Sequence, residues 1–281
     1  YADAPRLFVW DLACNVTATK QADAYREVCA ASYLNEANTE RNVNNIVEAF
    51  PPSPAVVGFQ EFPPASSTRG ACLRKALQAR GYVVVTGPDS TAIAVAGRRV
   101  TDLSGAEVSE VPVFDVSGVH STRMQVTQRR TIVARVDETV VAVLHCKEPK
   151  NAEHANELVE FIAQLRKDAG NPASFVVLAD TNLAKEAAIE SFAPAGLDVL
   201  PRVKTTAKLR STLHGQTYDT KKCHVCVIAS KDKIMCPPGT LRDVVVYPEL
   251  GGGRCLPDNA WPSDHCLTRG WFTPSTAAAF S

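Results

Sequence analysis

Short apolar runs rich in β-branched residues recur along the whole chain, and this pattern most constrains the fold. β-Branched residues favour strands, and continuous apolar runs of this length are typical of strands buried on both faces. We expect strands at residues 7–12, 55–59, 82–86, 91–96, 111–116, 131–136, 139–146, 174–179, 225–228, 241–246 and 266–272. A chain with this many buried strands needs at least one large sheet.

Helical segments are interleaved with the strands. They are expected at 23–34, 39–50, 69–80 and 153–167. In the second segment, Val43, Ile46, Val47 and Phe50 recur at helical spacing, and the proline pair that follows ends the helix. Neither a repeat nor a low-complexity linker divides the sequence. We therefore predict one α/β domain over residues 1–281, with two sheets and helices packed outside them.

Composition excludes some classes of function. The 281 residues include 30 basic and 30 acidic side chains, so bulk charge does not attract nucleic acid, and an anionic substrate needs a local patch or a metal ion. No apolar run has the length of a transmembrane helix, so no membrane partner is expected. The nine cysteines are scattered, unlike a disulfide framework. This predicts an intracellular, reducing compartment, without separating cytoplasm, nucleus and mitochondrion.

Polar residues follow or precede several of the expected strands. They are Asn15, Glu61, His145, Asp180, Asn182, Asp264 and His265. Taken singly, each has an ordinary explanation, because Asn and Asp form turns and a lone histidine beside an apolar run is commonly a core residue. Together they suit metal-assisted hydrolysis of a phosphate ester. Mg²⁺ prefers oxygen ligands, and imidazoles can meet the charge that develops on phosphoryl oxygens.

The ordered motifs resemble those of the endonuclease/exonuclease/phosphatase superfamily. The matching stretches are Cys14-Asn15-Val16, Phe59-Gln60-Glu61-Phe62, Leu144-His145, Leu178-Ala179-Asp180-Thr181-Asn182 and Ser263-Asp264-His265. They span nearly the whole chain. The resemblance implies a DNase I-like fold, a four-layer α/β sandwich of two packed mixed sheets flanked by helices. It also implies a phosphoesterase that uses Mg²⁺, with Mn²⁺ as the alternative.

The resemblance also implies a role for each residue. Glu61 is expected as the main metal ligand with Asn15 beside it, and Asp264 is expected to lie close to the metal. Asp180 is expected to orient or activate the attacking water, which Asn182 helps to hold. His145 and His265 are expected to contact the scissile phosphate and stabilise the transition state.

Two further stretches favour one branch of the superfamily. Thr217-Tyr218-Asp219 resembles the Thr-Phe-Asp of Ccr4-like and nocturnin-like deadenylases, and Leu256-Pro257 resembles the start of their closing motif. A 3′-to-5′ exoribonuclease acting on RNA 3′ ends is therefore expected. Tyr218 is the candidate for stacking on a base, although a core position in a strand explains it equally well. RNA or a nucleotide is the expected substrate, and a protein complex is a further expected partner.

One position departs from the superfamily pattern. The strand before the closing motif commonly carries an Asp that pairs with the last histidine, and the alignment from Thr217 places His224 there. A second imidazole does not replace a carboxylate electrostatically. Three explanations stay open: another carboxylate such as Asp219 or Asp243 takes the role, the enzyme is slow, or the chain is a pseudoenzyme.

These explanations leave alternatives for the function. A phosphomonoesterase acting on a nucleotide or another small phosphorylated molecule would use the same residues. A catalytically weak module that binds RNA or a protein partner would keep the fold without turnover. Release of inorganic phosphate, or binding without cleavage, separates these alternatives from the exoribonuclease.

Overall fold

The computed structural model describes residues 36–50, 55–87, 90–101, 131–146, 153–182, 196–201, 203, 205–210, 225–249, 261, 263 and 265–274. These residues fall into two compact units, each described by itself below. The larger unit comprises Phe50–Arg202, Ser230–Val245 and Thr268–Ser281, and the smaller comprises Tyr1–Ala49, Val203–Ala229 and Val246–Leu267. The single domain over 1–281 stays a prediction. The expected helix at 23–34 and the strands at 7–12 and 111–116 lie outside the described residues.

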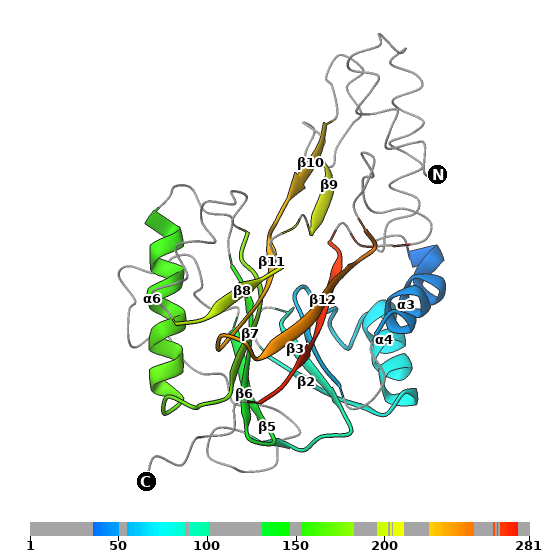
Figure 1. Ribbon diagram of the computed structural model, residues 1–281. Helices are drawn as coiled ribbons and strands as arrows, with labels where there is room; N and C mark the ends of the chain where they lie inside the picture. Colours follow the sequence, from blue (N-terminus) through cyan, green and yellow to red (C-terminus); the bar gives the residue numbers. More distant parts are fainter. Residues whose placement is uncertain are drawn as a thin grey trace. The chain divides into compact units, whose positions relative to one another are not determined.

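A six-stranded mixed sheet forms the centre of the larger unit (Figure 1). Its strands lie in the order β4 (Val100–Thr101), β5 (Thr131–Val136), β6 (Thr139–His145), β7 (Phe175–Asp180), β11 (Asp232–Cys236) and β8 (Asp198–Leu200). β6 and β7 are parallel, whereas the other neighbouring strands pair antiparallel. Parallel strands need a crossover connection, and α6 (Glu153–Asp168) provides it between β6 and β7.

A second sheet in the same unit is antiparallel over its described strands. β1 (Ala55–Phe59) and β2 (Tyr82–Thr86) pair with the two sides of β3 (Ala92–Ala96). All five residues of β3 are buried, as expected for a central strand. α4 (Thr68–Ala79) contacts β2, and Ser67 caps its N-terminus by accepting a hydrogen bond from the Gly70 N–H at 3.0 Å.

The two sheets and the two helices stack as four layers. α6 packs on one face of the six-stranded sheet, where Phe161, Ile162 and Leu165 meet side chains of β6 and β7. The opposite face packs against the other sheet, whose Val85, Ile93 and Val95 contact residues of β5 and β6. α4 lies on the outer side of that sheet (Figure 1). The predicted four-layer sandwich is therefore present within the larger unit.

Two further strands cover part of the six-stranded sheet. β12 (Leu241–Tyr247) and β13 (Leu267–Phe272) form a two-stranded ladder. Leu241 and Phe272 pack against Val176, Ile234 and Cys236 of the sheet. This ladder protects the apolar face of β7 and β11.

The smaller unit contains α3 (Thr39–Glu48), the 3₁₀ turn η1 (Glu36–Asn38) and the antiparallel pair of β9 (Thr206–Arg210) and β10 (Val225–Ala229). Trp261 and Cys266 form its small apolar cluster with Ile46 and Leu267. None of the described helices in either unit is long and apolar enough to cross a membrane.

Most expected elements within the described residues are confirmed with bounds shifted by one or two residues. The strands at 55–59, 82–86 and 131–136 begin and end where the sequence pattern placed them. Four described strands were not expected, namely β4, β8, β9 and β11. The omission of β11 matters most, because this strand carries a residue of the candidate site.

Candidate functional site

Three polar side chains share one row across the six-stranded sheet. In the strand register, His145 at the end of β6 pairs with Asp180 at the end of β7, and Asp180 pairs with Asp232 at the start of β11. Direct cross-strand partners point to the same face of a sheet. Leu178 and Ile234, two residues away from Asp180 and Asp232, belong to the face opposite α6. All three polar side chains therefore project from the end of the face that meets the second sheet.

Asp232 was not identified from the sequence. A carboxylate oxygen of Asp232 lies within 4.8 Å of one of Asp180. The sequence signal for it is the short apolar run of Ile234, Met235 and Cys236, which Lys233 separates from Asp232. Two carboxylates this close repel each other unless a cation or a proton lies between them. Oxygen donors of this kind suit Mg²⁺ or Mn²⁺, so the donor set fits the expected metal.

Glu61 reaches the same region from the second sheet because β1 approaches the larger sheet closely at Gly58. A Cβ atom on Gly58 would lie 2.8 Å from side-chain atoms of both Val143 and Leu178. Only glycine permits this approach of the backbone. Beyond β1, the Gln60 amide donates to the Leu178 carbonyl at 3.2 Å. The segment that carries Glu61 is thus held against the strand that carries Asp180.

The backbone of Glu61 adopts a left-handed conformation, with φ of 58°. Such a conformation is uncommon for a residue other than glycine and needs support from its neighbours. Phe62, buried beside it, donates its N–H to the Ser90 carbonyl at 2.6 Å. The Arg74 guanidinium lies 4.5 Å from the Phe62 ring centroid and donates to the Pro63 carbonyl at 3.2 Å. These contacts fix the turn and leave the Glu61 side chain 63% exposed.

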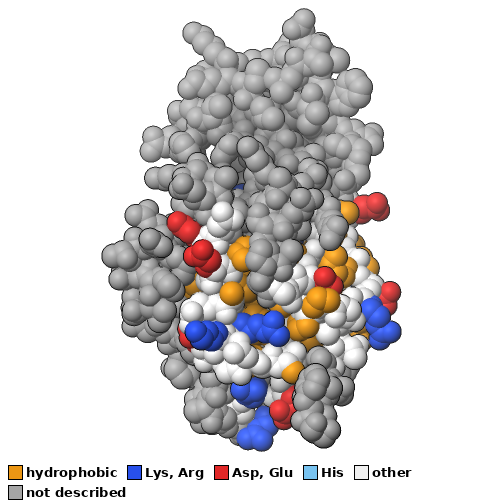
Figure 2. All heavy atoms as spheres, turned by 60° about the vertical axis from the view of Figure 1, so that its left-hand side comes forward, with side chains coloured by type: hydrophobic (Ala, Val, Ile, Leu, Met, Phe, Trp, Pro, Cys, Tyr) orange, Lys and Arg blue, Asp and Glu red, His pale blue; other side chains and the backbone are white. Residues whose placement is uncertain are grey.

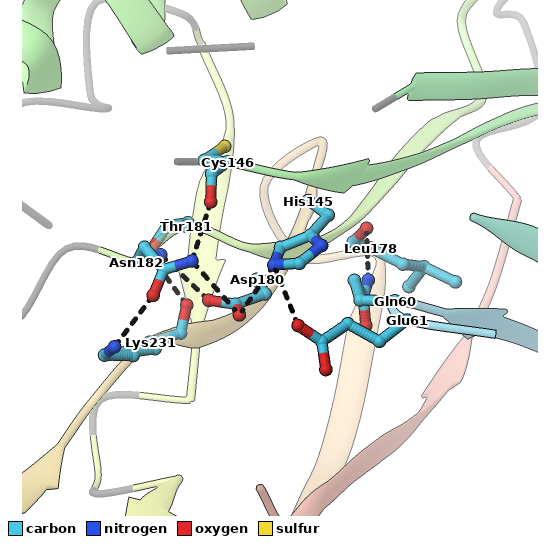
Figure 3. A network of polar contacts seen from close by, with 9 residues as sticks. All are labelled: Gln60, Glu61, His145, Cys146, Leu178, Asp180, Thr181, Asn182 and Lys231. Carbon is cyan, nitrogen blue, oxygen red and sulfur yellow. Dashed lines mark hydrogen bonds and ion pairs between the residues drawn. The ribbon is translucent and has the colours of Figure 1, made fainter. Parts of the chain in front are cut away.

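His145 lies between two carboxylates (Figure 3). Its Nε2 is 3.9 Å from Oε1 of Glu61 and 3.7 Å from Oδ2 of Asp180. The imidazole is 7% exposed, and the Glu61 carboxylate is largely open to solvent. An imidazole at this place can donate a hydrogen bond to a bound anion.

Asn182 holds the Asp180 carboxylate from the segment after β7. Its backbone N–H donates to Oδ1 of Asp180 at 2.9 Å, and its Nδ2 lies 3.4 Å from Oδ2 of the same residue. Nδ2 also donates to the Cys146 carbonyl at 2.6 Å. Asn182 has a φ of 51°, a left-handed conformation that asparagine tolerates better than most residues. The amide thus contacts both Asp180 and Cys146, and its expected role in holding the attacking water stays a prediction.

The Cys146 thiol takes no part in acid–base chemistry. It is fully buried, and burial, followed by the nearby Asp180 charge, raises the pKa of the thiol well above its ordinary value. A neutral thiol is neither a good nucleophile nor a good metal ligand. Among the described residues, Cys72, Cys236 and Cys266 are also free thiols.

The structure brings together Glu61, His145, Asp180 and Asn182 of the expected site residues. Asn15, Tyr218, His224 and Asp264 lie outside the described residues, so their roles stay predictions. His265 lies in the smaller unit just before β13, where its N–H donates to the Ser263 hydroxyl at 3.1 Å and its carbonyl accepts from the Trp261 indole at 2.6 Å. Its participation beside the carboxylates of the larger unit stays a prediction.

The strand that begins directly after His224 in the sequence does not pair with β7. β10, which begins at Val225, pairs with β9, whereas β11 is the strand that pairs with β7. The residue opposite Asp180 is therefore Asp232. Of the two alternative carboxylates, Asp219 lies outside the described residues, and Asp243 is an exposed residue of β12.

The scan of family models and the search of curated proteins gave no match to this chain. Solved structures do match. Truncated TDP2 from Caenorhabditis elegans is 17% identical with a TM-score of 0.50, over 86% of this chain and 94% of that chain. TDP2 from D. rerio, crystallised with a single strand DNA product, is 19% identical with a TM-score of 0.50, over 86% of this chain and 96% of that chain. An endonuclease/exonuclease/phosphatase family protein from Bacteroides thetaiotaomicron is 14% identical with a TM-score of 0.49, over 85% of this chain and 93% of that chain.

The two TDP2 matches cover most of both chains, and at this identity they establish the fold. The chain therefore has the DNase I-like α/β fold of these two structures. This confirms the fold that the sequence motifs predicted. The closer resemblance to Ccr4-type deadenylases stays a prediction, because its motifs lie outside the described residues.

Proposed function

We propose that the protein is a divalent-metal-dependent phosphodiesterase that removes nucleotides from the 3′ ends of RNA. The observation that carries the proposal is the row of His145, Asp180 and Asp232 at the end of the sheet, with Glu61 beside it. Such a group of carboxylates and an imidazole, exposed through Glu61, has the chemistry that phosphate-ester hydrolysis requires.

The residue that would hold the metal ion is Glu61, joined by Asn15 and Asp264 if the resemblance holds, and the carboxylates of Asp180 and Asp232 would add negative charge nearby. When bound, the ion supplies charge neutralisation at the phosphoryl oxygens and favours an ionised water. Mg²⁺ is the first candidate because all these donors are oxygen atoms, and Mn²⁺ accepts the same set.

The protein's own groups then have separate tasks. Asp180, held by Asn182, accepts a proton from the attacking water. The water oxygen forms the new bond to phosphorus, the bond from phosphorus to the 3′ oxygen breaks, and that oxygen takes a proton from solvent. His145 meets the negative charge on the phosphoryl oxygens. Asp232, opposite Asp180 in the strand register, supplies the carboxylate that His224 does not provide.

RNA is proposed as the substrate because of the motifs at Thr217-Tyr218-Asp219 and Leu256-Pro257. D. rerio TDP2 was crystallised with a single strand DNA product. Single-stranded DNA is therefore the alternative substrate to include in the test. Base stacking on Tyr218 would add roughly 1–3 kcal/mol per base to binding of either polymer. A direct comparison of RNA with DNA therefore decides whether the substrate carries ribose or deoxyribose.

The test is cleavage of 5′-labelled single-stranded RNA and DNA of the same sequence with Mg²⁺, Mn²⁺ or EDTA. The proposal expects stepwise shortening of RNA from its 3′ end, loss of activity with EDTA, and loss of activity in Glu61→Ala and Asp180→Ala. Undiminished cleavage in either variant contradicts the proposed site. Release of inorganic phosphate without shortening indicates the phosphomonoesterase, and preferential shortening of DNA overturns the RNA assignment. Binding without turnover under every metal indicates a binding module.

A further inference from the structure

Lys231 joins the segment after β7 to the start of β11 through both its backbone and its side chain. Its carbonyl accepts hydrogen bonds from the Thr181 N–H at 2.9 Å and the Thr181 hydroxyl at 2.7 Å. Its Nζ donates to Oδ1 of Asn182 at 2.7 Å (Figure 3). The lysine is only half-buried, yet its ammonium is directed at an amide within the site. Neither the sequence motifs nor the resemblance assigned Lys231 a role.

The contacts of Asn182 determine which end of its carboxamide faces Asp180. A lysine ammonium is a donor only, so it contacts the amide oxygen and not the amide nitrogen. The Cys146 carbonyl is an acceptor only, and it contacts the amide nitrogen at 2.6 Å. A flipped amide would oppose donor to donor at Lys231 and acceptor to acceptor at Cys146. Nδ2 is thereby kept on the side of Asp180 Oδ2.

We propose that Lys231 is a positioning residue that fixes the Asn182 carboxamide and, through it, the Asp180 carboxylate. The inference rests on the proposed function insofar as Asp180 is the group that accepts the proton from water. Without the Lys231 donor, the amide loses one of its two fixed ends and rotates more freely. Asp180 then spends less time in the orientation that serves the attacking water, and turnover falls while substrate binding does not.

A different role for a lysine at this place would be direct contact with a phosphate of the substrate. The two roles predict different kinetics. A contact made equally with the bound substrate and the transition state changes KM, whereas a group that orders the catalytic carboxylate changes kcat. Lys231→Met removes the ammonium with little change in chain length, and Lys231→Arg retains a cationic donor. Lys75→Met, at an exposed position of α4, is the matched control for loss of one positive charge.

The first experiment is a double-mutant cycle on single-turnover and steady-state cleavage of RNA. Lys231→Met is expected to lower kcat about tenfold with KM changed less than about twofold, and Lys231→Arg to recover most of that loss. In an Asn182→Ala background, Lys231→Met should change kcat less than about twofold, because the amide through which it acts is absent. Two results overturn the proposal. One is a raised KM with unchanged kcat in Lys231→Met. The other is a decrease of kcat in the Asn182→Ala background as large as in the natural chain.

The second experiment does not depend on activity. The side-chain amide signal of Asn182 in a ¹H–¹⁵N NMR spectrum is assigned by its loss in Asn182→Ala. Lys231→Met is expected to shift this signal and speed its exchange with water, whereas Lys231→Arg and Lys75→Met leave it close to its original position. An unchanged signal in Lys231→Met overturns the positioning role, and Lys231→Ala serves the same comparison if the methionine variant does not fold. If the natural chain cleaves no phosphate ester, the proposed function fails, while this signal still decides the link between Lys231 and Asn182.

Discussion

At the scale of single residues, the site depends on side chains whose surroundings are supplied by distant parts of the chain. Asp180 is buried, and both of its carboxylate oxygens lie near groups of Asn182. Asp232 comes from β11, which β8, β9 and β10 separate from β7 in the sequence. The pairing of β7 with β11 nevertheless places Asp232 opposite Asp180. A row built in this way keeps its spacing only while the strands keep their pairing.

Asp232→Asn tests whether Asp232 supplies the carboxylate that His224 does not provide. We expect kcat to fall roughly 10²–10⁴-fold, because an amide neither orients an imidazole in the same tautomer nor stabilises its charge. The measurement is single-turnover cleavage of RNA. Asp243→Asn, an exposed carboxylate of β12, is the matched control and should change kcat less than about twofold. A larger effect at Asp243 than at Asp232, or a large gain from His224→Asp, would return the role to the original alignment.

Glu61→Gln tests the metal ligand. The substitution keeps the size of the side chain and removes its charge, so Mg²⁺ binding measured by calorimetry should weaken roughly tenfold to a hundredfold. Glu138→Gln is the control, because Glu138 is an exposed residue of the turn between β5 and β6, at the opposite end of β6 from His145. Equal affinity in Glu61→Gln and the natural chain would show that Glu61 is not a ligand.

At the scale of elements, strands with uniform apolar composition were predictable and strands with charged residues were not. The β-branched pattern placed β1, β2 and β5 with their observed bounds. β11 was missed because it begins with Asp232 and Lys233, and two adjacent charged residues are typical of a solvated segment. In the structure Lys233 is 3% exposed, and its Nζ donates to the Pro201 carbonyl at 2.6 Å and to the Ser230 hydroxyl. These hydrogen bonds offset the cost of burying the ammonium, so a lysine is tolerated in an inner strand. Only the tertiary structure reveals these partners.

Gly58→Ala tests the close approach of β1 to the larger sheet. The added Cβ would lie 2.8 Å from atoms of Val143 and Leu178, so the sheets must separate locally. We expect the free energy of unfolding to fall by about 1–3 kcal/mol and Mg²⁺ binding to weaken, because Glu61 follows Gly58 on the same segment. Denaturant unfolding and calorimetry measure the two effects. Val83→Ala, at a 55% exposed position of β2, should change stability by less than about 0.5 kcal/mol. Unaltered stability in Gly58→Ala would mean that the sheets are not in tight contact there.

At the scale of the whole molecule, local sequence patterns gave the kind of fold, and the motifs gave its family resemblance. The order of strands in the six-stranded sheet follows from pairings between segments far apart in the sequence, which periodicity does not encode. This is why Glu61, His145 and Asp180 were found as motif residues, whereas Asp232 and Lys231 emerged only from register and contacts. On the face shown in Figure 2, basic, acidic and hydrophobic side chains of the described residues are interspersed. The zero net charge of the chain thus agrees with recruitment of an anionic substrate by a local site.

Metal binding should also stabilise the folded chain as a whole. An ion that binds the native state but not the unfolded state adds about 2.7 kcal/mol at a concentration one hundred times its dissociation constant. For a chain of this size Tm rises about 2–4 °C for each kcal/mol, so the expected rise is roughly 5–11 °C, measured by calorimetry with Mg²⁺ against EDTA at matched ionic strength. The double variant Glu61→Ala/Asp232→Ala should show little of this rise, and the control Glu138→Gln should show all of it. An equal rise of Tm in the double variant would place the stabilising ion elsewhere in the molecule. The row of His145, Asp180 and Asp232 would then not be the place where the ion binds.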